Sequence, residues 1–155
     1  MRTGIGIDSH RFEAGRRLVL GGVEVPYELG LAGHSDADVL AHAIVDALLG
    51  AAGLGDIGRH FPDTHEAWRD ADSMDLLRTV LGDVASAGWA VAHVDVTVML
   101  ERPKLAPHRD AIRDSLAAEL GSVNVKFTTG EKMGFVGREE GTAALAVATL
   151  EAIGP

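Results

Sequence analysis

The 155-residue chain contains no cysteine. It can form neither a disulfide framework nor a thiolate metal site, so any transition-metal site must use histidine and carboxylate ligands. The absence of cysteine suits a reducing compartment, and we expect a cytoplasmic protein. No apolar stretch reaches the roughly 18–20 residues that span a bilayer, and the first residues lack the apolar core of a signal peptide. We therefore expect a soluble, unprocessed protein.

Basic residues are also scarce, because 14 Lys and Arg stand against 23 Asp and Glu, for a formal net charge of −9. Nucleic-acid binding needs a basic surface to meet the phosphates, and anionic membranes attract basic segments. The charge thus argues against nucleic acid and membrane as partners. Most of the acidic excess lies in residues 1–75, which hold 13 acidic and 6 basic side chains. Either a solvated acidic surface or a functional site explains this bias.

The hydrophobic fraction of 46% and the charged fraction of 24% are ordinary for a globular protein, and the length fits a single domain, 1–155. Alternation of apolar and polar residues predicts strands at 2–10, 94–100 and 123–127, with a strand or hairpin at 17–25. Helical spacing and breaker residues predict helices at 36–53, 73–87, 107–121 and 138–153. We expect an α+β fold: a small mixed four-stranded sheet with helices packed on one face. The bare face would then be buried against further copies of the chain.

Two details of these helices can be checked against the structure. Ser35 is predicted to cap the 36–53 helix, with Asp38 as its capping-box partner. In the last helix, the predicted packing side consists of Ala144, Leu145, Ala148 and Ile153.

A candidate metal site combines the first strand with the first helix. Asp8 and His10 are two residues apart on a strand, so their side chains point the same way. His42 shares one helix face with Asp38 and Asp46, at spacings of four residues. One aspartate and two histidines would leave a tetrahedral position open, as in a catalytic zinc site. The alternative is a surface ion-pair stripe beside an unrelated Asp-x-His.

Four further segments carry polar groups that suit phosphate or polyol binding. Residues 34–36 precede the first helix, whose N-terminal N–H groups could hold an anion. The 55–64 loop could wrap a polyol, and the segments 101–107 and 128–132 follow strands and could bind phosphate or a divalent metal. Helix capping, an ordinary turn and polar connections explain the same segments.

Taken together, these segments resemble the 2-C-methyl-D-erythritol 2,4-cyclodiphosphate synthases of the non-mevalonate isoprenoid pathway. The similarity covers nearly the whole chain. It rests on the GxGxDxHxF start, the GHSDAD run, DALLGAAGLGDIG with FPDT, ERPKL-P, and NVKFTTGEKMGFVGR.

The resemblance implies a lyase that cyclises 4-CDP-2-C-methyl-D-erythritol 2-phosphate and releases CMP. It implies Zn²⁺ on Asp8, His10 and His42, and a second divalent ion, Mg²⁺ or Mn²⁺, on Glu131. His34 and Thr129 match positions that stabilise the transition state. We interpret Asp38 and Asp46 as groups that orient the metal ligands.

The resemblance also implies a set of substrate contacts. Those near the metal and the polyol are Asp8, Ser9, His10, His34, Ser35, Asp56, Ile57, Gly58, Phe61, Pro62, Asp63, Thr64 and His65. Those near the cytidine and its phosphates are Leu100, Glu101, Arg102, Pro103, Lys104, Leu105, Ala106, Thr128, Thr129, Gly130 and Glu131.

Family members are homotrimers with active sites between subunits and a sheet-lined axis, which fits the bare sheet face expected above. Phe135 and Arg138 match positions that line an axial cavity, where some members hold an isoprenoid diphosphate. Two other functions use the same residues. A Zn-dependent phosphohydrolase would use a metal-bound water, and a non-catalytic trimer would only bind metal or isoprenoid.

Overall fold

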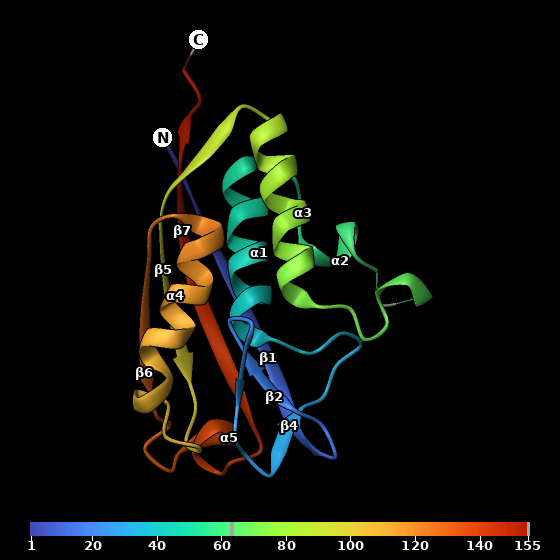
Figure 1. The fold of residues 1–155 in the computed structure, drawn as a ribbon, viewed down its shortest axis with the longest axis vertical. Coiled ribbons are helices and arrows are strands. Elements are labelled where there is room, and N and C mark those ends of the chain that lie inside the picture. Colours follow the sequence, from blue (N-terminus) through green and yellow to red (C-terminus); the bar gives the residue numbers. More distant parts are fainter. Residues whose placement is uncertain (63, 155) are drawn as a thin grey trace.

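The structure is a computed structural model, and it describes residues 1–62 and 64–154. A layer of strands packs against a layer of helices (Figure 1). The strands are β1 (Arg2–Ala14), β2 (Leu18–Leu20), β3 (Val23–Val25), β4 (Leu29–Leu31), β5 (Trp89–Met99), β6 (Val123–Thr128) and β7 (Gly141–Ala152). The helices are α1 (Val39–Ala52), α2 (Ile57–His60), α3 (Ser73–Ser86), α4 (Arg109–Leu120) and α5 (Gly134–Gly137), with short 3-10 turns η1 (Glu66–Trp68) and η2 (Ala106–His108).

The main sheet has five strands in the order β4-β1-β7-β5-β6. Only the β5–β6 pair is parallel, while β1 pairs antiparallel with both β4 and β7, and β5 pairs antiparallel with β7. The hairpin predicted within 17–25 is present as the separate β2–β3 pair. The α+β class is confirmed, and the predicted count of four strands in the sheet is wrong because β4 and β7 both join it.

The predicted helix at 138–153 is wrong, because most of this segment is β7, the central strand of the sheet. Ala144, Ala146 and Ala148 are buried, while Leu145 between them is 38% exposed. Burial of every second residue is the period of a strand. Alanine is the strongest helix former, but here its small side chain is selected because α1 lies close against the sheet.

Two glycines of β1 explain that closeness. A Cβ at Gly6 would lie 1.9 Å from the carbonyl oxygen of Ala43, and one at Gly4 would lie 2.2 Å from that of Ala47. No side chain fits there, so α1 packs with its backbone almost on β1. The glycines that weaken the strand signal in the sequence are therefore what bring His42 to the strand that carries Asp8 and His10.

The first helix begins three residues later than predicted. Its N-cap is Asp38, whose carboxylate accepts a hydrogen bond from Ala41 N at 3.1 Å; the predicted cap, Ser35, lies in the preceding loop. Gly53 ends the helix in the left-handed conformation, as expected for a C-terminal glycine. The helix N-terminus is therefore capped by the chain's own carboxylate, which favours the capping alternative for this segment over an anion site.

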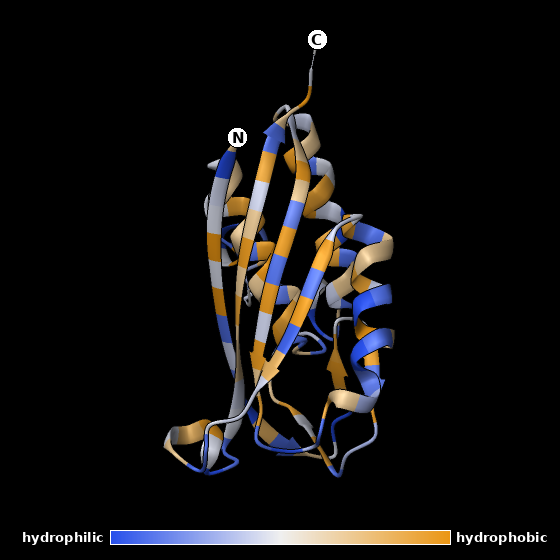
Figure 2. Ribbon diagram, turned by 90° about the vertical axis from the view of Figure 1, so that its left-hand side faces the viewer, coloured by the Kyte–Doolittle hydropathy of each residue, from blue (hydrophilic) through white to orange (hydrophobic). Residues whose placement is uncertain are grey.

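Helices cover one face of the sheet and leave the other open. Figure 2 shows the strands in front with the helices behind them, and residues of alternating hydropathy along the strands. Ile5 and Ile7 of β1 are 63% and 64% exposed on the open face, where they stand opposite Val147 and Leu145 of β7. At the β5–β6 edge the face turns polar, with Asp95 bonded to Lys126.

No helix in the described ranges is both long and apolar enough to cross a bilayer.

Candidate metal centre and active-site pocket

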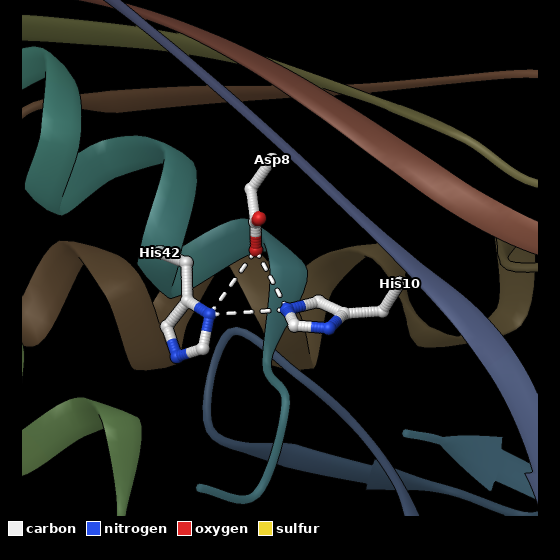
Figure 3. A group of neighbouring side chains, drawn as sticks. All are labelled: Asp8, His10 and His42. Atoms are coloured by element: carbon white, nitrogen blue, oxygen red, sulfur yellow. Dashed lines mark hydrogen bonds and ion pairs between the residues drawn. The ribbon is translucent and has the colours of Figure 1, made fainter. Parts of the chain in front are cut away.

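Three side chains from β1 and α1 converge at one point, as Figure 3 shows. Asp8 Oδ2 lies 2.8 Å from His10 Nε2 and 3.1 Å from His42 Nδ1, and the two ring nitrogens are 3.2 Å apart. All three side chains are partly buried. The prediction that Asp8 and His10 converge with His42 is confirmed as geometry.

The spacing suits a tetrahedral metal ion. Zinc bonds of about 2.0–2.1 Å place neighbouring ligand atoms roughly 3.3 Å apart, close to the three distances in this group. The outer nitrogen of His10 supports the same conclusion. Its Nδ1 lies 2.8 Å from the carbonyl oxygen of Ala32, which can only accept, so Nδ1 carries a hydrogen, and in the neutral ring that a metal would bind Nε2 presents its lone pair inward. The donor set therefore fits a divalent cation.

His42 turns its outer nitrogen to two hydroxyl groups. Nε2 lies 2.8 Å from Ser73 Oγ and 3.1 Å from Ser35 Oγ. Both serines are buried, and Ser73 is the first residue of α3. The helix α3 thus supports a metal centre whose ligands come from β1 and α1.

The charges of the group act on each other. Burial acts to raise the pKa of Asp8, but hydrogen bonds and attraction from His10 and His42 outweigh it and hold this pKa at about 2. Burial acts to lower the pKa of His10, but the hydrogen bond that Asp8 accepts from it and the attraction of the Asp8 charge outweigh burial, so the pKa of His10 is raised. Asp8 is therefore ionised at neutral pH and available as a ligand.

Asp38 and Asp46 bond to backbone groups instead of to the metal ligands. Asp38 is fully buried, and its two oxygens accept from the N–H groups of Gly21, Gly22 and Ala41. It therefore ties the β2–β3 hairpin to the start of α1. Asp46 Oδ1 accepts from Ile57 N at 3.1 Å and anchors the start of α2.

A pocket of about 600 Å³ opens beside the two histidines. Its polar side is lined by His10, His34, Ser35 and His42. Its remaining walls come from Gly33, Ile57, Gly58, Phe61, Pro62, Thr64, Trp68 and Leu76. We call this the metal-side pocket. It can hold a small polar ligand with an anionic group facing the metal ligands.

Several predicted contacts lie at the edge of this pocket. His34 lies beside His65, whose carbonyl oxygen is 3.2 Å from His34 Nε2. Asp56 caps α2 by accepting from Arg59 N at 2.9 Å. Ser9 is exposed and lines a different hollow. The predicted contact at Asp63 lies outside the described residues.

The predicted cytidine segment forms a second pocket at the ends of β5 and β6, with a volume of about 200 Å³. We call this the strand-end pocket. Its lining includes Leu100, Pro103, Lys104, Leu105, Ala106, Thr128 and Thr129. Arg102 lies outside that lining, and Glu101 accepts from Gly130 N at 3.0 Å, which ties the two strand-end loops together.

The structure separates the two pockets within one chain. The metal-side pocket is lined by residues of α2, and the strand-end pocket includes Arg109 of α4. Figure 1 shows these two helices on opposite sides of the molecule. His34 and Thr129 therefore do not meet in one chain. Glu131 is exposed and lies beside Thr129, with 3.3 Å from Thr129 Oγ1 to its carboxylate.

The residues predicted for an axial cavity lie outside the linings of the two pockets described above. Phe135 is 43% exposed and lines a hollow with Ser9, Arg11 and Glu140. Arg138 pairs with Glu140 at 2.8 Å.

Sequence reasoning missed several residues of both pockets. Ser73 supports His42, Trp68 packs edge-on against Phe61 at 4.9 Å between centroids, and Arg109 lies over the Phe127 ring at 4.7 Å. Only Ser73 carried a signal, as a predicted helix start. Its contact with His42 joins residues 31 positions apart and depends on how α3 packs on α1.

A helix-covered mixed sheet with an open Asp-His-His group facing a pocket defines a class: proteins with a candidate catalytic metal centre, as opposed to a closed structural one. The comparisons narrow this class to one family. A sequence model of the YgbB family matches residues 1–151, and the chain belongs to this family.

The relatives agree in name and in shape. A 2-C-methyl-D-erythritol 2,4-cyclodiphosphate synthase from Salinibacter ruber is 59% identical, over 97% of this chain and 99% of that protein. The solved structure of the bifunctional IspDF from Campylobacter jejuni superposes with a TM-score of 0.93 at 44% identity, over 97% of this chain; the chain spans 42% of that longer protein. A 2C-methyl-D-erythritol-2,4-cyclodiphosphate synthase solved in a CDP-bound form has a TM-score of 0.89 at 40% identity, over 97% of this chain and 100% of that one.

Proposed function

We propose that this chain is a cyclodiphosphate synthase that converts 4-CDP-2-C-methyl-D-erythritol 2-phosphate to 2-C-methyl-D-erythritol 2,4-cyclodiphosphate and CMP. The observation that carries the proposal is the convergent Asp8, His10 and His42 group, which opens into a pocket in a chain that matches synthases over nearly its full length. The reaction belongs to the non-mevalonate route to isoprenoid precursors. By class it is a phosphorus–oxygen lyase, and we assign it to the cytoplasm.

The reaction is an intramolecular phosphoryl transfer. An oxygen of the 2-phosphate attacks the β-phosphorus and forms a new P–O bond. The bond from the β-phosphorus to the bridging oxygen breaks, and CMP leaves with that oxygen. No water is consumed, so the protein must position the two phosphates and neutralise their charge.

The Asp8, His10 and His42 group would hold Zn²⁺. Bound there, the ion supplies Lewis-acid charge to a phosphate oxygen at its open position. Asp8 brings one negative charge to the site, while the two imidazoles coordinate as neutral ligands. His34 lines the same pocket and would stabilise the negative charge that develops on a phosphate oxygen.

The walls of the metal-side pocket would bind the methylerythritol end. The space for the polyol would be surrounded by Ile57, Gly58, Phe61, Pro62 and Thr64, with Ser35 beside the metal ligands. Asp56 is one residue before this wall and can accept from a substrate hydroxyl through the oxygen that does not cap α2.

The strand-end pocket would bind the cytidine diphosphate end. Lys104 supplies a positive charge, and the apolar residues around it can enclose a base. Thr128 and Thr129 bring hydroxyl groups to the same pocket, and Thr129 would stabilise the transition state. Glu131, beside Thr129, would hold the second divalent ion, Mg²⁺ or Mn²⁺.

The separation of the two pockets supports an active site shared between copies of the chain. One substrate molecule must reach both the metal and the cytidine pocket, and the two are lined by separate sets of residues in a single chain, one beside α2 and the other beside α4. A homotrimer that buries the open sheet face would place one chain's metal-side pocket beside its neighbour's strand-end pocket. Phe135 and Arg138 would then line the axis, where an isoprenoid diphosphate could bind.

The test is product analysis by ³¹P NMR with the cytidylylated substrate. The proposal predicts CMP and a cyclic diphosphate in equal amounts, and no turnover after the metal is removed with a chelator. A phosphohydrolase using the same Asp-His-His group would give a linear product. Zinc binding in a trimer that turns over no substrate would indicate a non-catalytic binding protein. Either of these results would reject the synthase.

A further inference from the structure

We propose that Ser73, held by Asp36, is a positioning residue that fixes the ring of His42 with its lone pair toward the metal. The inference rests on the metal centre of the proposed function. It adds a third element, α3, to a centre otherwise built from β1 and α1.

The argument starts at Asp36, in the loop before α1. Its carboxylate accepts hydrogen bonds from both the backbone N–H and the hydroxyl of Ser73, the former at 3.1 Å. Ser73 is fully buried. A carboxylate only accepts, so the single hydroxyl hydrogen of Ser73 is committed to Asp36.

That commitment decides which nitrogen of His42 carries a hydrogen. Ser73 Oγ lies 2.8 Å from His42 Nε2 and has only lone pairs left to offer. His42 Nε2 must therefore donate, so in the neutral ring, the form that binds a metal, the lone pair is on Nδ1, the nitrogen nearest Asp8 and His10. A histidine ligand needs this tautomer to bind metal through Nδ1.

Ser35 belongs to the same hydrogen-bond network and is compatible with a hydrogen on His42 Nε2. Its Oγ accepts from Ala37 N at 3.2 Å and lies 3.1 Å from His42 Nε2. If Ser35 donated to His42 instead, Ser73 Oγ and His42 Nε2 would face each other at 2.8 Å with no hydrogen between them. The Asp36–Ser73 pair excludes that arrangement.

The two histidines are thus oriented by different means. His10 is fixed by a backbone carbonyl, that of Ala32, whereas His42 is fixed by a side chain that mutation can remove. Removing the Ser73 hydroxyl should free the His42 ring and lower metal affinity, as loss of such outer partners typically does by about 10–100-fold.

The experiment measures Zn²⁺ affinity by competition with a chromophoric chelator for Ser73→Ala and for the control Ser86→Ala, an exposed serine on the same helix. We expect Ser73→Ala to lose roughly 10–100-fold in affinity and to shift the visible absorption of the Co²⁺-substituted protein. Ser86→Ala should match the wild type in both. The unfolding temperature of the metal-free proteins shows whether α3 is intact.

Wild-type Zn²⁺ affinity in Ser73→Ala, with an unchanged Co²⁺ spectrum, would overturn the inference and leave the proposed function standing. Failure of the wild type itself to bind Zn²⁺ would overturn both. If Ser73→Ala is unfolded without metal, Ser73→Thr decides, because it keeps the hydroxyl: recovered affinity supports the inference, and a loss equal to that of the alanine variant overturns it.

Discussion

At the scale of single residues, the most unusual group is Asp38, a fully buried carboxylate whose hydrogen bonds come from backbone N–H groups of the β2–β3 hairpin and of α1. The three N–H donors and the position at a helix N-terminus favour the ionised form of Asp38. Burial opposes the charge and dominates, raising the pKa of Asp38 to about 6 from an ordinary value of 3.8. The residue that joins two elements therefore also makes their junction sensitive to pH.

The sign of that sensitivity is opposite to that of most carboxylates. Between about pH 4 and pH 6 the folded chain keeps a proton on Asp38 that the unfolded chain has lost, so stability falls as pH rises. We expect a loss on the order of 1–3 kcal/mol across this window. In Asp38→Asn this contribution disappears. Urea unfolding of both metal-free proteins from pH 4 to pH 7 measures it, and parallel stability curves would contradict the assignment.

At the scale of elements, the α1–β1 contact decides whether the metal ligands meet. Gly6→Ala would place a Cβ 1.9 Å from the Ala43 carbonyl oxygen, and backbone cannot move aside as a flexible side chain can. We expect a destabilisation of roughly 1–3 kcal/mol together with weaker Zn²⁺ binding, because His42 moves away from Asp8 with its helix.

Gly82→Ala is the matched control for that substitution. Gly82 lies within α3 with open space around it, and alanine is the better helix former. Its unfolding free energy should stay level or rise, with Zn²⁺ affinity unchanged. Calorimetry and chelator competition on the two variants test the account, and a Gly6→Ala protein with wild-type metal affinity would refute it.

The sequence predicts helices and strands well where the hydrophobic periodicity is strong and where neighbouring residues alone determine the structure. The spacing of Asp8 and His10 on a strand predicts that their side chains point the same way, but spacing alone leaves their meeting with His42 open, and the resemblance to the synthases implies it. The β7 strand was not predictable in this way, because its alanines are chosen by the nearness of α1, which only the tertiary fold supplies. The same holds for the contact of Ser73 with His42 and for the Asp38 cap, which replaces Ser35.

At the scale of the whole molecule, the open sheet face is the surface that the proposed trimer would bury. Ile5 is 63% exposed at the centre of its apolar part, opposite Val147. In the proposed trimer this surface is buried, so Ile5→Lys places an unpaired charge in the interface. We expect it to shift the protein from trimer to monomer in analytical ultracentrifugation.

The Ile5→Lys variant also separates metal binding, which needs one chain, from turnover, which in the proposed trimer needs the neighbour's strand-end pocket. Asp8, His10 and His42 come from one chain, so the Ile5→Lys monomer should still bind Zn²⁺ while turnover is lost with the neighbour's strand-end pocket. Ile153→Lys is the control, because Ile153 is 53% exposed beyond the end of β7. A monomeric Ile5→Lys protein with full activity would show that a single chain holds the complete site.

The net charge of −9 bears on how such a molecule handles a polyanionic substrate. The protein alone repels it, so positive charge must come from bound divalent ions and from the few cations near the pockets, such as Lys104. The acidic excess in residues 1–75 includes Asp8 and Asp36, which the structure places at the metal centre and on Ser73, and Asp38, Asp46 and Asp56, which hold the starts of α1 and α2 around the pocket. The acidity thus serves the site as well as the surface.

The central claim is that the bound metal orients a phosphate for attack by another phosphate and does not activate water. Turnover of the cytidylylated substrate in ¹⁸O-labelled water, followed by mass spectrometry of both products, tests it most directly. The account predicts a cyclic diphosphate and CMP that carry no ¹⁸O, because the attacking oxygen comes from the substrate. One ¹⁸O atom in either product would show that water is the nucleophile and would contradict the account.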